Sequence, residues 1–345
     1  MTLWRHWDAV YISAALAGHT DKIISSTLSD DGKIAVTGSL DNTARVWDTE
    51  TGKELARLDC DDDVYFVTLS SDKKILVTAS MNTVVQVWSL AEKGPILNLK
   101  GYTDLARPSL TADGRLLAVP FQSELKIVDA HTGDPLLRCR DSANLISCRF
   151  SPDGNLLVGA SNSGPFVVFD ARSGDIQQGR TGKGFPIAFS KQRLLTLNDS
   201  GIVRVIGTKD WNELTQIGTG RYETEGQIAG AVFSDDENTI YTLSWDGLLS
   251  AWSSNDGHRI ERLTRESISD RTLRGSDDGT VLLTMGNGQV ASIWRWRRSI
   301  GLAGLVWLPE LWLTLFSSLA MLISFKGDRK QLRNPIDQAE VARNN

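Results

Sequence analysis

The chain has 345 residues, of which 41% are hydrophobic and 23% charged; this composition excludes disordered and fibrous proteins and leaves room for a sizeable core. Its net charge is −5, and because residues 295–345 hold eight basic and four acidic side chains, residues 1–294 carry 29 basic against 38 acidic ones. Nucleic-acid affinity rests largely on Lys and Arg that neutralise phosphates, so this acidic body argues against a nucleic-acid partner.

The cysteines and the N-terminus favour a cytosolic body. Cys60, Cys139 and Cys148 form no close pair, so the sequence has neither a disulfide framework nor a CxxC zinc motif. Residues 1–8 are charged and rich in Trp, where a secretory signal needs an apolar run. We therefore predict no oxidising compartment, no metal and no cofactor.

A repeat of about 41 residues organises the chain between residues 17 and 298. Seven turn segments begin 41, 41, 40, 39, 44 and 42 residues apart, at Ser29, Ser70, Thr111, Ser151, Ser190, Ser234 and Ser276. A second anchor closes an apolar alternation about eighteen positions later, at Trp47, Trp88, Val128, Phe169, Ile206, Trp252 and Trp294. Two independent markers in the same register predict seven copies of one unit.

Each unit is expected to be a small four-stranded sheet. In the first copy the β-rich runs are 23–28, 34–39, 44–48 and 54–58, separated by turns of Asp, Asn, Gly, Ser and Thr. The third turn recurs with a glycine that supplies a positive φ, at Gly52, Gly133, Gly174 and Gly257. Such a sheet cannot bury both of its faces alone, so neighbouring units must cover them.

The first copy contains Gly18-His19, Ser39-Leu40-Asp41 and Trp47-Asp48. These residues resemble the WD-repeat family, whose units of about forty residues form the blades of a β-propeller. The resemblance implies a buried hydrogen-bonded network of His19, Asp41, Trp47 and either Thr37 or Ser39. It covers residues 10 to 295, although the other copies are degenerate and the fifth keeps almost only its pattern.

The two ends of the repeat region complement each other. Tyr11 to Leu16 is placed like a fourth strand that lacks the first three, and after Trp294 no fourth strand follows. An N-terminal strand that completes the last blade would remove the exposed edges of an open array. We therefore predict an all-β, seven-bladed propeller of four-stranded blades, with residues 1–16 supplying the closing strand and 17–298 the repeats.

Residues 299–325 have a different character from the repeats and are followed by a polar tail, 326–345. Glu310 is the only ionisable side chain between Arg298 and Lys326. A helix over residues 309–325 would be about 25 Å long, close to the hydrocarbon core of about 30 Å. We predict a membrane anchor over 302–325 with the propeller on the cytoplasmic side; an interfacial segment and a soluble helix packed on a partner stay open.

One face of the predicted anchor helix is small and polar. Its side chains fall at helical spacing and are Glu310, Thr314, Ser317, Ser318 and Ser324. Small and hydroxylated side chains let a second transmembrane helix approach and hydrogen-bond, so a membrane protein or a second copy is an expected partner. The alternative is that these hydroxyls bond to their own backbone carbonyls.

Motifs for catalysis are missing from the sequence. The histidines outside the repeat network are His6, His131 and His258, and none has a ligand partner at metal spacing. No GxSxG, HExxH, phosphate-binding Gly loop or dinucleotide fingerprint is present. The acidic run 61–63 suits either a hard cation, a basic partner or a solvated loop. We predict a protein that is not an enzyme.

The repeat also predicts a binding surface. In the WD-repeat family the residue before the turn Asp, between the second and third strands, often faces partners. Counting seven back from each anchor gives Leu40, Met81, Phe121, Asn162, Asp199, Trp245 and Asn287. Leu40, Met81, Phe121 and Trp245 are large and apolar, which favours a protein-binding face. Plugging of the channel mouth and packing beneath neighbouring loops are the alternatives.

The sequence thus predicts a non-catalytic scaffold or accessory subunit, tethered to a membrane by its C-terminal helix and binding a protein partner on the propeller rim. Two alternatives stay open. One is a soluble propeller whose C-terminal helix docks into a larger complex, and the other is a propeller enzyme or ligand sensor that uses the central channel.

Overall fold

The computed structural model describes residues 10–102, 106–121, 124–140, 145–161, 165–181, 184–218, 227–234, 236–263, 270–276, 280–286 and 288–296. All of them belong to one of two units of the chain, Ala9–Trp296; the other unit combines Met1–Asp8 with Arg297–Asn345. The predicted anchor and its face, Glu310 to Ser324, therefore lie outside the described residues. Of the residues that are described, none belongs to a helix long and apolar enough to cross a membrane.

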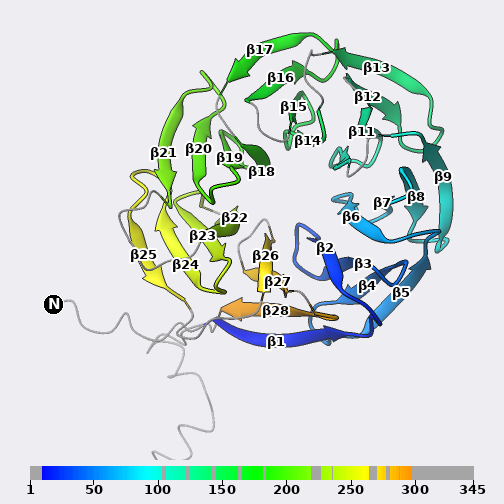
Figure 1. The fold of residues 1–345 in the computed structure, drawn as a ribbon, viewed down its shortest axis with the longest axis horizontal. Coiled ribbons are helices and arrows are strands. Elements are labelled where there is room, and N and C mark those ends of the chain that lie inside the picture. Colours follow the sequence, from blue (N-terminus) through cyan, green and yellow to red (C-terminus); the bar gives the residue numbers. More distant parts are fainter. Residues whose placement is uncertain are drawn as a thin grey trace, which may run out of the picture. The chain divides into compact units, whose positions relative to one another are not determined.

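Within the described residues, twenty-eight strands form seven four-stranded antiparallel sheets, numbered blades 1 to 7 in chain order (Figure 1). Blades 1 to 3 are β2 (Ile23–Leu28), β3 (Ile34–Ser39), β4 (Thr43–Asp48), β5 (Glu54–Asp59); β6 (Val64–Leu69), β7 (Ile75–Ser80), β8 (Val84–Ser89), β9 (Gly94–Lys100); and β10 (Ser109–Leu110), β11 (Leu116–Phe121), β12 (Glu124–Asp129), β13 (Pro135–Arg140).

Blades 4 to 7 are β14 (Ser147–Phe150), β15 (Leu156–Ala160), β16 (Phe166–Asp170), β17 (Ile176–Thr181); β18 (Phe185–Phe189), β19 (Arg193–Leu197), β20 (Val203–Gly207), β21 (Glu213–Ile217); β22 (Ile228–Phe233), β23 (Thr239–Ser244), β24 (Leu249–Ser253), β25 (Arg259–Arg262); and β26 (Asp270–Gly275), β27 (Val281–Gly286), β28 (Val290–Trp296) with β1 (Val10–Ala17). The first strand of each blade lies nearest the ring axis, and the fourth lies on the periphery (Figure 1).

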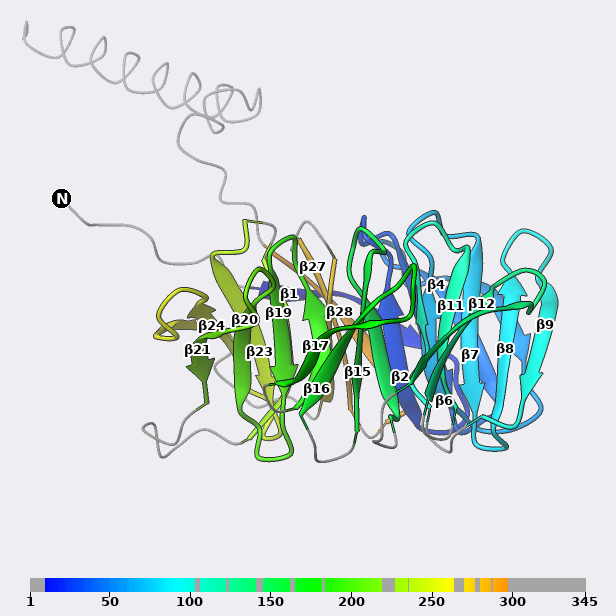
Figure 2. The same ribbon diagram turned by 90° about the horizontal axis from the view of Figure 1, so that it is seen from above.

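The N-terminal strand closes the ring. β1 pairs with β28 from Val10↔Trp296 to Ala17↔Val290, so blade 7 takes its fourth strand from the opposite end of the repeat region. This confirms the predicted closure, with the strand extending one residue beyond each end of the predicted run, Tyr11 to Leu16. Figure 2 shows the strands running between the two faces of the ring.

The hydrophobic core consists of seven clusters, and each lies between two neighbouring blades. One cluster joins blades 7 and 1 through Leu16, Trp47 and Leu283, all fully buried. Another joins blades 5 and 6 through Leu195 and Trp252. Because every blade buries its faces against its neighbours, no blade can be removed without exposing apolar surface on both sides of the gap.

The anchor positions mark an irregularity that recurs in every blade. The strand pairing shifts register next to the anchor, for example between Val46 and Trp47 in blade 1 and between Val205 and Ile206 in blade 5. The third-turn glycines nearby have positive φ, 71° at Gly52 and 80° at Gly174, as the sequence predicted. The repeat therefore preserves backbone geometry even where its signature residues are replaced.

Candidate functional site

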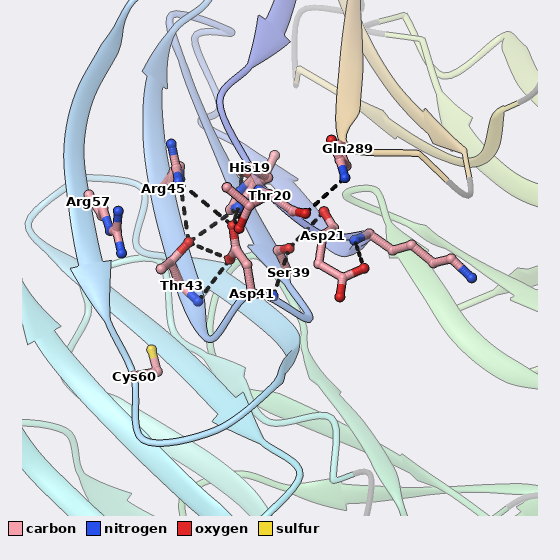
Figure 3. A network of polar contacts seen from close by, with 12 residues as sticks. His19, Thr20, Asp21, Ser39, Asp41, Thr43, Arg45, Arg57, Cys60 and Gln289 are labelled. Carbon is pink, nitrogen blue, oxygen red and sulfur yellow. Dashed lines mark hydrogen bonds and ion pairs between the residues drawn. The ribbon is translucent and has the colours of Figure 1, made fainter.

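Blade 1 contains a continuous chain of hydrogen bonds from Trp47 to Asp41, and Figure 3 shows its end around His19, Asp41, Thr43 and Arg45. The Trp47 indole N–H donates to Thr37 Oγ1 at 2.8 Å, and Thr37 Oγ1 lies 2.7 Å from His19 Nε2. His19 Nδ1 lies 2.8 Å from Asp41 Oδ2, and a carboxylate only accepts, so Nδ1 carries the proton and Nε2 accepts from Thr37. The structure thus selects Thr37 rather than Ser39, whose hydroxyl donates to Asp21 O at 3.1 Å.

The charges in this network follow from its burial. Burial lowers the pKa of His19, and the hydrogen bond to Asp41 opposes that effect without overcoming it. For Asp41, burial raises the pKa, but hydrogen bonds from Thr43, the Thr20 backbone and His19 prevail and bring it to about 2. Neutral His19 also fits the geometry, because its unprotonated Nε2 must accept the Thr37 hydroxyl. The network is a structural device and offers no free nucleophile or base.

We predict that acidification weakens the ring through His19. Unfolded His19 takes up a proton near pH 6.5 and folded His19 at a lower pH, so stability is full above pH 6.5 and falls as the pH drops, by at most about 1.4 kcal/mol per pH unit. The pKa of Asp41 is depressed, so its contribution is lost only near pH 4 to 2. Thermal midpoints from pH 7.5 to 5 should fall more steeply for the wild type than for His19→Gln, which keeps His131 and His258. Parallel profiles would contradict this.

Part of the network recurs in blades whose sequences are degenerate. Each anchor Trp donates its indole N–H to a buried threonine: Trp88 to Thr78 (3.0 Å), Trp252 to Thr242 (2.7 Å) and Trp294 to Thr284 (2.7 Å). In blade 2, Cys60 takes the place of His19, with its Sγ 3.9 Å from Thr78 Oγ1. Burial raises the pKa of this half-buried thiol to about 11, so it is protonated at neutral pH.

The predicted partner-binding residues lie on one face of the ring, called the turn face because it carries the turns between second and third strands. Leu40, Met81 and Trp245 are equivalent: the backbone N–H of each donates to the residue just before the first strand of its blade, at 3.0, 3.0 and 2.7 Å. Met81 is 51% exposed and Trp245 52%, whereas Leu40 is half-buried. Asp199 is exposed in blade 5, and Asn162 and Asn287 lie outside the described residues.

Phe121 differs from the other turn-face residues because it packs against its own blade. Its ring makes an edge contact with Tyr102 at 5.5 Å between centroids, and Lys126 Nζ lies 3.1 Å from its centroid. Burial lowers the pKa of Lys126. Phe121 is half-buried. It therefore fits packing beneath a neighbouring segment, one of the alternatives from the sequence, better than exposure to a partner.

The other polar candidates are scattered. His258 pairs with Asp256 at 2.6 Å on the surface, and His131 is exposed in the corresponding turn of blade 3. Within the described ranges, no group of His, Cys, Asp or Glu could hold a metal ion, the acidic run 61–63 included. Cys139 and Cys148 are buried and free.

Sequence reasoning missed three arginines at the centre of the ring: Arg107, Arg149 and Arg274. Aligning the seven copies on their first turns would have found Arg149 and Arg274. Two residues before the first-turn anchor of each copy stand Thr27, Thr68, Ser109, Arg149, Ala188, Val232 and Arg274. All seven lie on the innermost strands, which surround the ring axis, and are partly exposed. We call this the ring-lining position, although Ala188 and Val232 also pack against the clusters between blades.

Comparison with known proteins agrees with this architecture. The family model described as "WD domain, G-beta repeat" matches residues 11–48 and 52–89, each match running from a fourth strand into the next blade. The chain is also similar to WD repeat-containing protein SL1-17 of Schistosoma mansoni, with 27% identity over 160 residues. That match covers 46% of this chain and 53% of the relative, about half of its length.

WD-repeat propellers generally act as protein-interaction scaffolds and are typically not enzymes. The turn face and the buried Trp–Thr bonds described above are features of the propeller and not of a catalytic centre. The matched repeats, the similar WD-repeat protein and the seven four-stranded blades therefore support the WD-repeat β-propeller family for this chain.

Proposed function

We propose that this chain is a non-catalytic scaffold or accessory subunit that binds a protein partner on the turn face and is held at a membrane by residues 302–325. The observation that carries the proposal is the exposure of Met81 (51%) and Trp245 (52%) at equivalent positions of one face. Large apolar side chains are costly to expose to water, and Trp and Met are both enriched in the cores of protein interfaces. Trp is also among the residues that contribute most binding energy.

The partner would lie across the face instead of in one cleft. Met81 belongs to blade 2 and Trp245 to blade 6, and blades 7 and 1 separate them along the shorter arc. Leu40 of blade 1 lies on that arc and is half-buried. A protein that contacts Met81, Leu40 and Trp245 together spans the half of the ring that β1 closes.

A second apolar surface competes with the turn face. In five blades the fourth strand carries an exposed aliphatic side chain, one residue after the residue that pairs with the anchor on the third strand. These side chains form an outer belt of Leu55, Ile96, Leu136, Leu214 and Ile260. Leu136 and Leu214 are each 49% exposed, nearly as much as Trp245. Exposure alone does not separate the surfaces, so residues of the belt serve as matched controls.

Membrane tethering rests on the sequence of the C-terminal segment. Residues 311–325 contain no charge, and basic residues follow at Lys326, Arg329 and Lys330. We propose the cytoplasmic side for the propeller. The hydroxylated face around Thr314 and Ser317 suits contact with a second transmembrane helix. The same residues would form an apolar docking helix if the partner were a soluble complex.

Site-specific photo-crosslinking in isolated membranes tests both parts of the proposal. A photoreactive side chain is placed at Met81, Trp245, Leu136 or Leu214 in the full-length chain, and at Trp245 in a chain ending at Arg298. Full-length protein should resist an alkaline carbonate wash and the shortened chain should not. Positions 81 and 245 should give one adduct with the same partner mass, several-fold stronger than positions 136 and 214.

Each readout has an outcome that contradicts its part. Equal release of both chains by carbonate would exclude the anchor, and equal adducts from the belt would move the binding surface to the outer strands. With the crosslinked partner in hand, Trp245→Ala should weaken affinity by about 2 kcal/mol, roughly 30-fold. Leu214→Ala should change it less than about twofold.

A further inference from the structure

The three arginines at the ring centre come from three blades. Arg149 on β14 and Arg274 on β26 occupy the ring-lining position, where the remaining five blades have Thr, Ser, Ala or Val. Arg107 precedes β10 and pairs with Ser147 of the neighbouring innermost strand. Arg107 is exposed, and Arg149 and Arg274 are partly exposed.

Their contacts leave most of their donors unused. Arg274 donates from Nε to Ser26 O at 3.1 Å and from one terminal nitrogen to Leu273 O at 3.0 Å. The Arg107 guanidinium lies 5.6 Å from the centroid of the Phe185 ring, so it reaches past blade 4 towards blade 5. Over the described ranges, the Arg149 side chain makes no hydrogen bond, and no carboxylate forms an ion pair with any of the three.

Two other shielded arginines of the same ring form ion pairs. Arg45, with its side chain 8% exposed, lies 2.8 Å from Glu54, and Arg204, 12% exposed, lies 3.2 Å from Glu213. Those two act as structural ion pairs in the manner expected of shielded cations. The central arginines break this pattern within a body that carries more carboxylates than bases.

The three charges act on one another. Loss of hydration within the surrounding protein, followed by repulsion from Arg149 and Arg107, lowers the pKa of Arg274 to about 10, and loss of hydration also lowers the pKa of Arg107 and Arg149. All three are protonated at neutral pH, so the innermost strands carry three positive charges that no carboxylate of the described ranges pairs with. Bringing like charges together costs folding free energy, and an anion between them would reverse that cost.

We propose that Arg107, Arg149 and Arg274 form a binding site at the ring centre for the phosphate group of a small-molecule phosphate ester or polyphosphate. Guanidinium groups present planar pairs of N–H donors that match phosphate oxygens, and three of them can satisfy a dianion. The hydroxyls of Thr27 and Thr68, at the same position of blades 1 and 2, add neutral donors, whereas Ser109 Oγ accepts from the Phe150 N–H of blade 4. The site is independent of the protein partner proposed for the turn face.

Binding of tripolyphosphate and inorganic phosphate to the full-length chain, in non-ionic detergent, tests this site. Calorimetric affinity and the thermal midpoint are compared with sodium chloride at equal ionic strength, for the wild type, Arg149→Gln, Arg107→Gln and Arg172→Gln. Arg172 is an exposed arginine of the turn after β16 and is the matched control. Ligand should raise the midpoint of the wild type and of Arg172→Gln alike, because it binds only the folded state.

Arg149→Gln and Arg107→Gln should each bind tripolyphosphate at least about tenfold more weakly, the loss expected for one charge-assisted hydrogen-bonded contact. Without ligand, Arg149→Gln should melt no lower than the wild type, since it removes a repelling charge and no internal bond; a purely structural arginine would behave in the opposite way. If Arg149→Gln does not fold, the tripolyphosphate affinity of Arg107→Gln, which changes an exposed side chain, decides whether the site exists. No response in the wild type, or equal affinities in the central and control variants, would overturn the site.

Discussion

Removing residues 1–16 should abolish the soluble ring, whereas removing residues 1–8 should leave it intact. The shorter deletion ends before β1, and the longer one takes away almost the whole strand that pairs with β28. The longer deletion exposes the edge of β28, an unpaired strand that invites aggregation, and removes Leu16 from the cluster between blades 7 and 1. Because domains are stable by only about 5 to 15 kcal/mol, losing both is expected to exceed the margin.

Two point variants on β1 give the same test without a deletion. Leu16→Ala empties a fully buried position and should lower the free energy of unfolding by about 2 to 5 kcal/mol. Ile12→Ala, on the same strand but 53% exposed, should cost less than about 1 kcal/mol. Denaturant unfolding followed by Trp fluorescence measures both. A soluble 17–345 chain with the wild-type midpoint would show that the ring does not depend on its closing strand.

The fold could be predicted from the sequence because blades 1, 2, 3, 4 and 6 repeat one turn chemistry. Ser29 accepts the N–H of Ile34 and donates to Asp31, and Ser151 repeats both bonds with Leu156 and Asp153. These local bonds need the same residue types at the same spacing, so they leave a readable period. Closure was also predictable, since it follows from which strands the two ends lack.

The candidate sites were less predictable because they depend on side-chain contacts that form only in the folded protein. Exposure of the turn-face residues could not be ranked, since the burial of Phe121 depends on Tyr102 and Lys126, which approach it only in the folded blade. The choice between Thr37 and Ser39 depended in the same way on the direction of two side chains two residues apart on one strand. The central arginines were accessible to sequence reasoning, but only after each innermost strand is aligned on its turn.

Replacing Thr37 by Val should destabilise the ring by about 2 to 5 kcal/mol although the side chains have nearly the same shape. Thr37 Oγ1 accepts from Trp47 and donates to His19, and both partners are buried, with 1% and 4% exposed. Valine leaves the indole N–H and His19 Nε2 without partners, and an unpaired buried polar group costs about 1 to 3 kcal/mol. The free energy of unfolding in urea at pH 7.5 measures the loss.

The equivalent change in blade 2 separates the two bonds. Thr78→Val leaves one strong donor, the Trp88 indole N–H, without a partner, because Cys60 Sγ is only a weak partner at 3.9 Å. The expected loss in the free energy of unfolding is about 1 to 3 kcal/mol. Thr37→Ser restores the hydroxyl and should recover most of the loss at the cost of one methyl group. Equal effects of Thr37→Val and Thr78→Val would mean that His19 adds nothing, and that the complete network of blade 1 is no stronger than the single Trp–Thr bond of its neighbours.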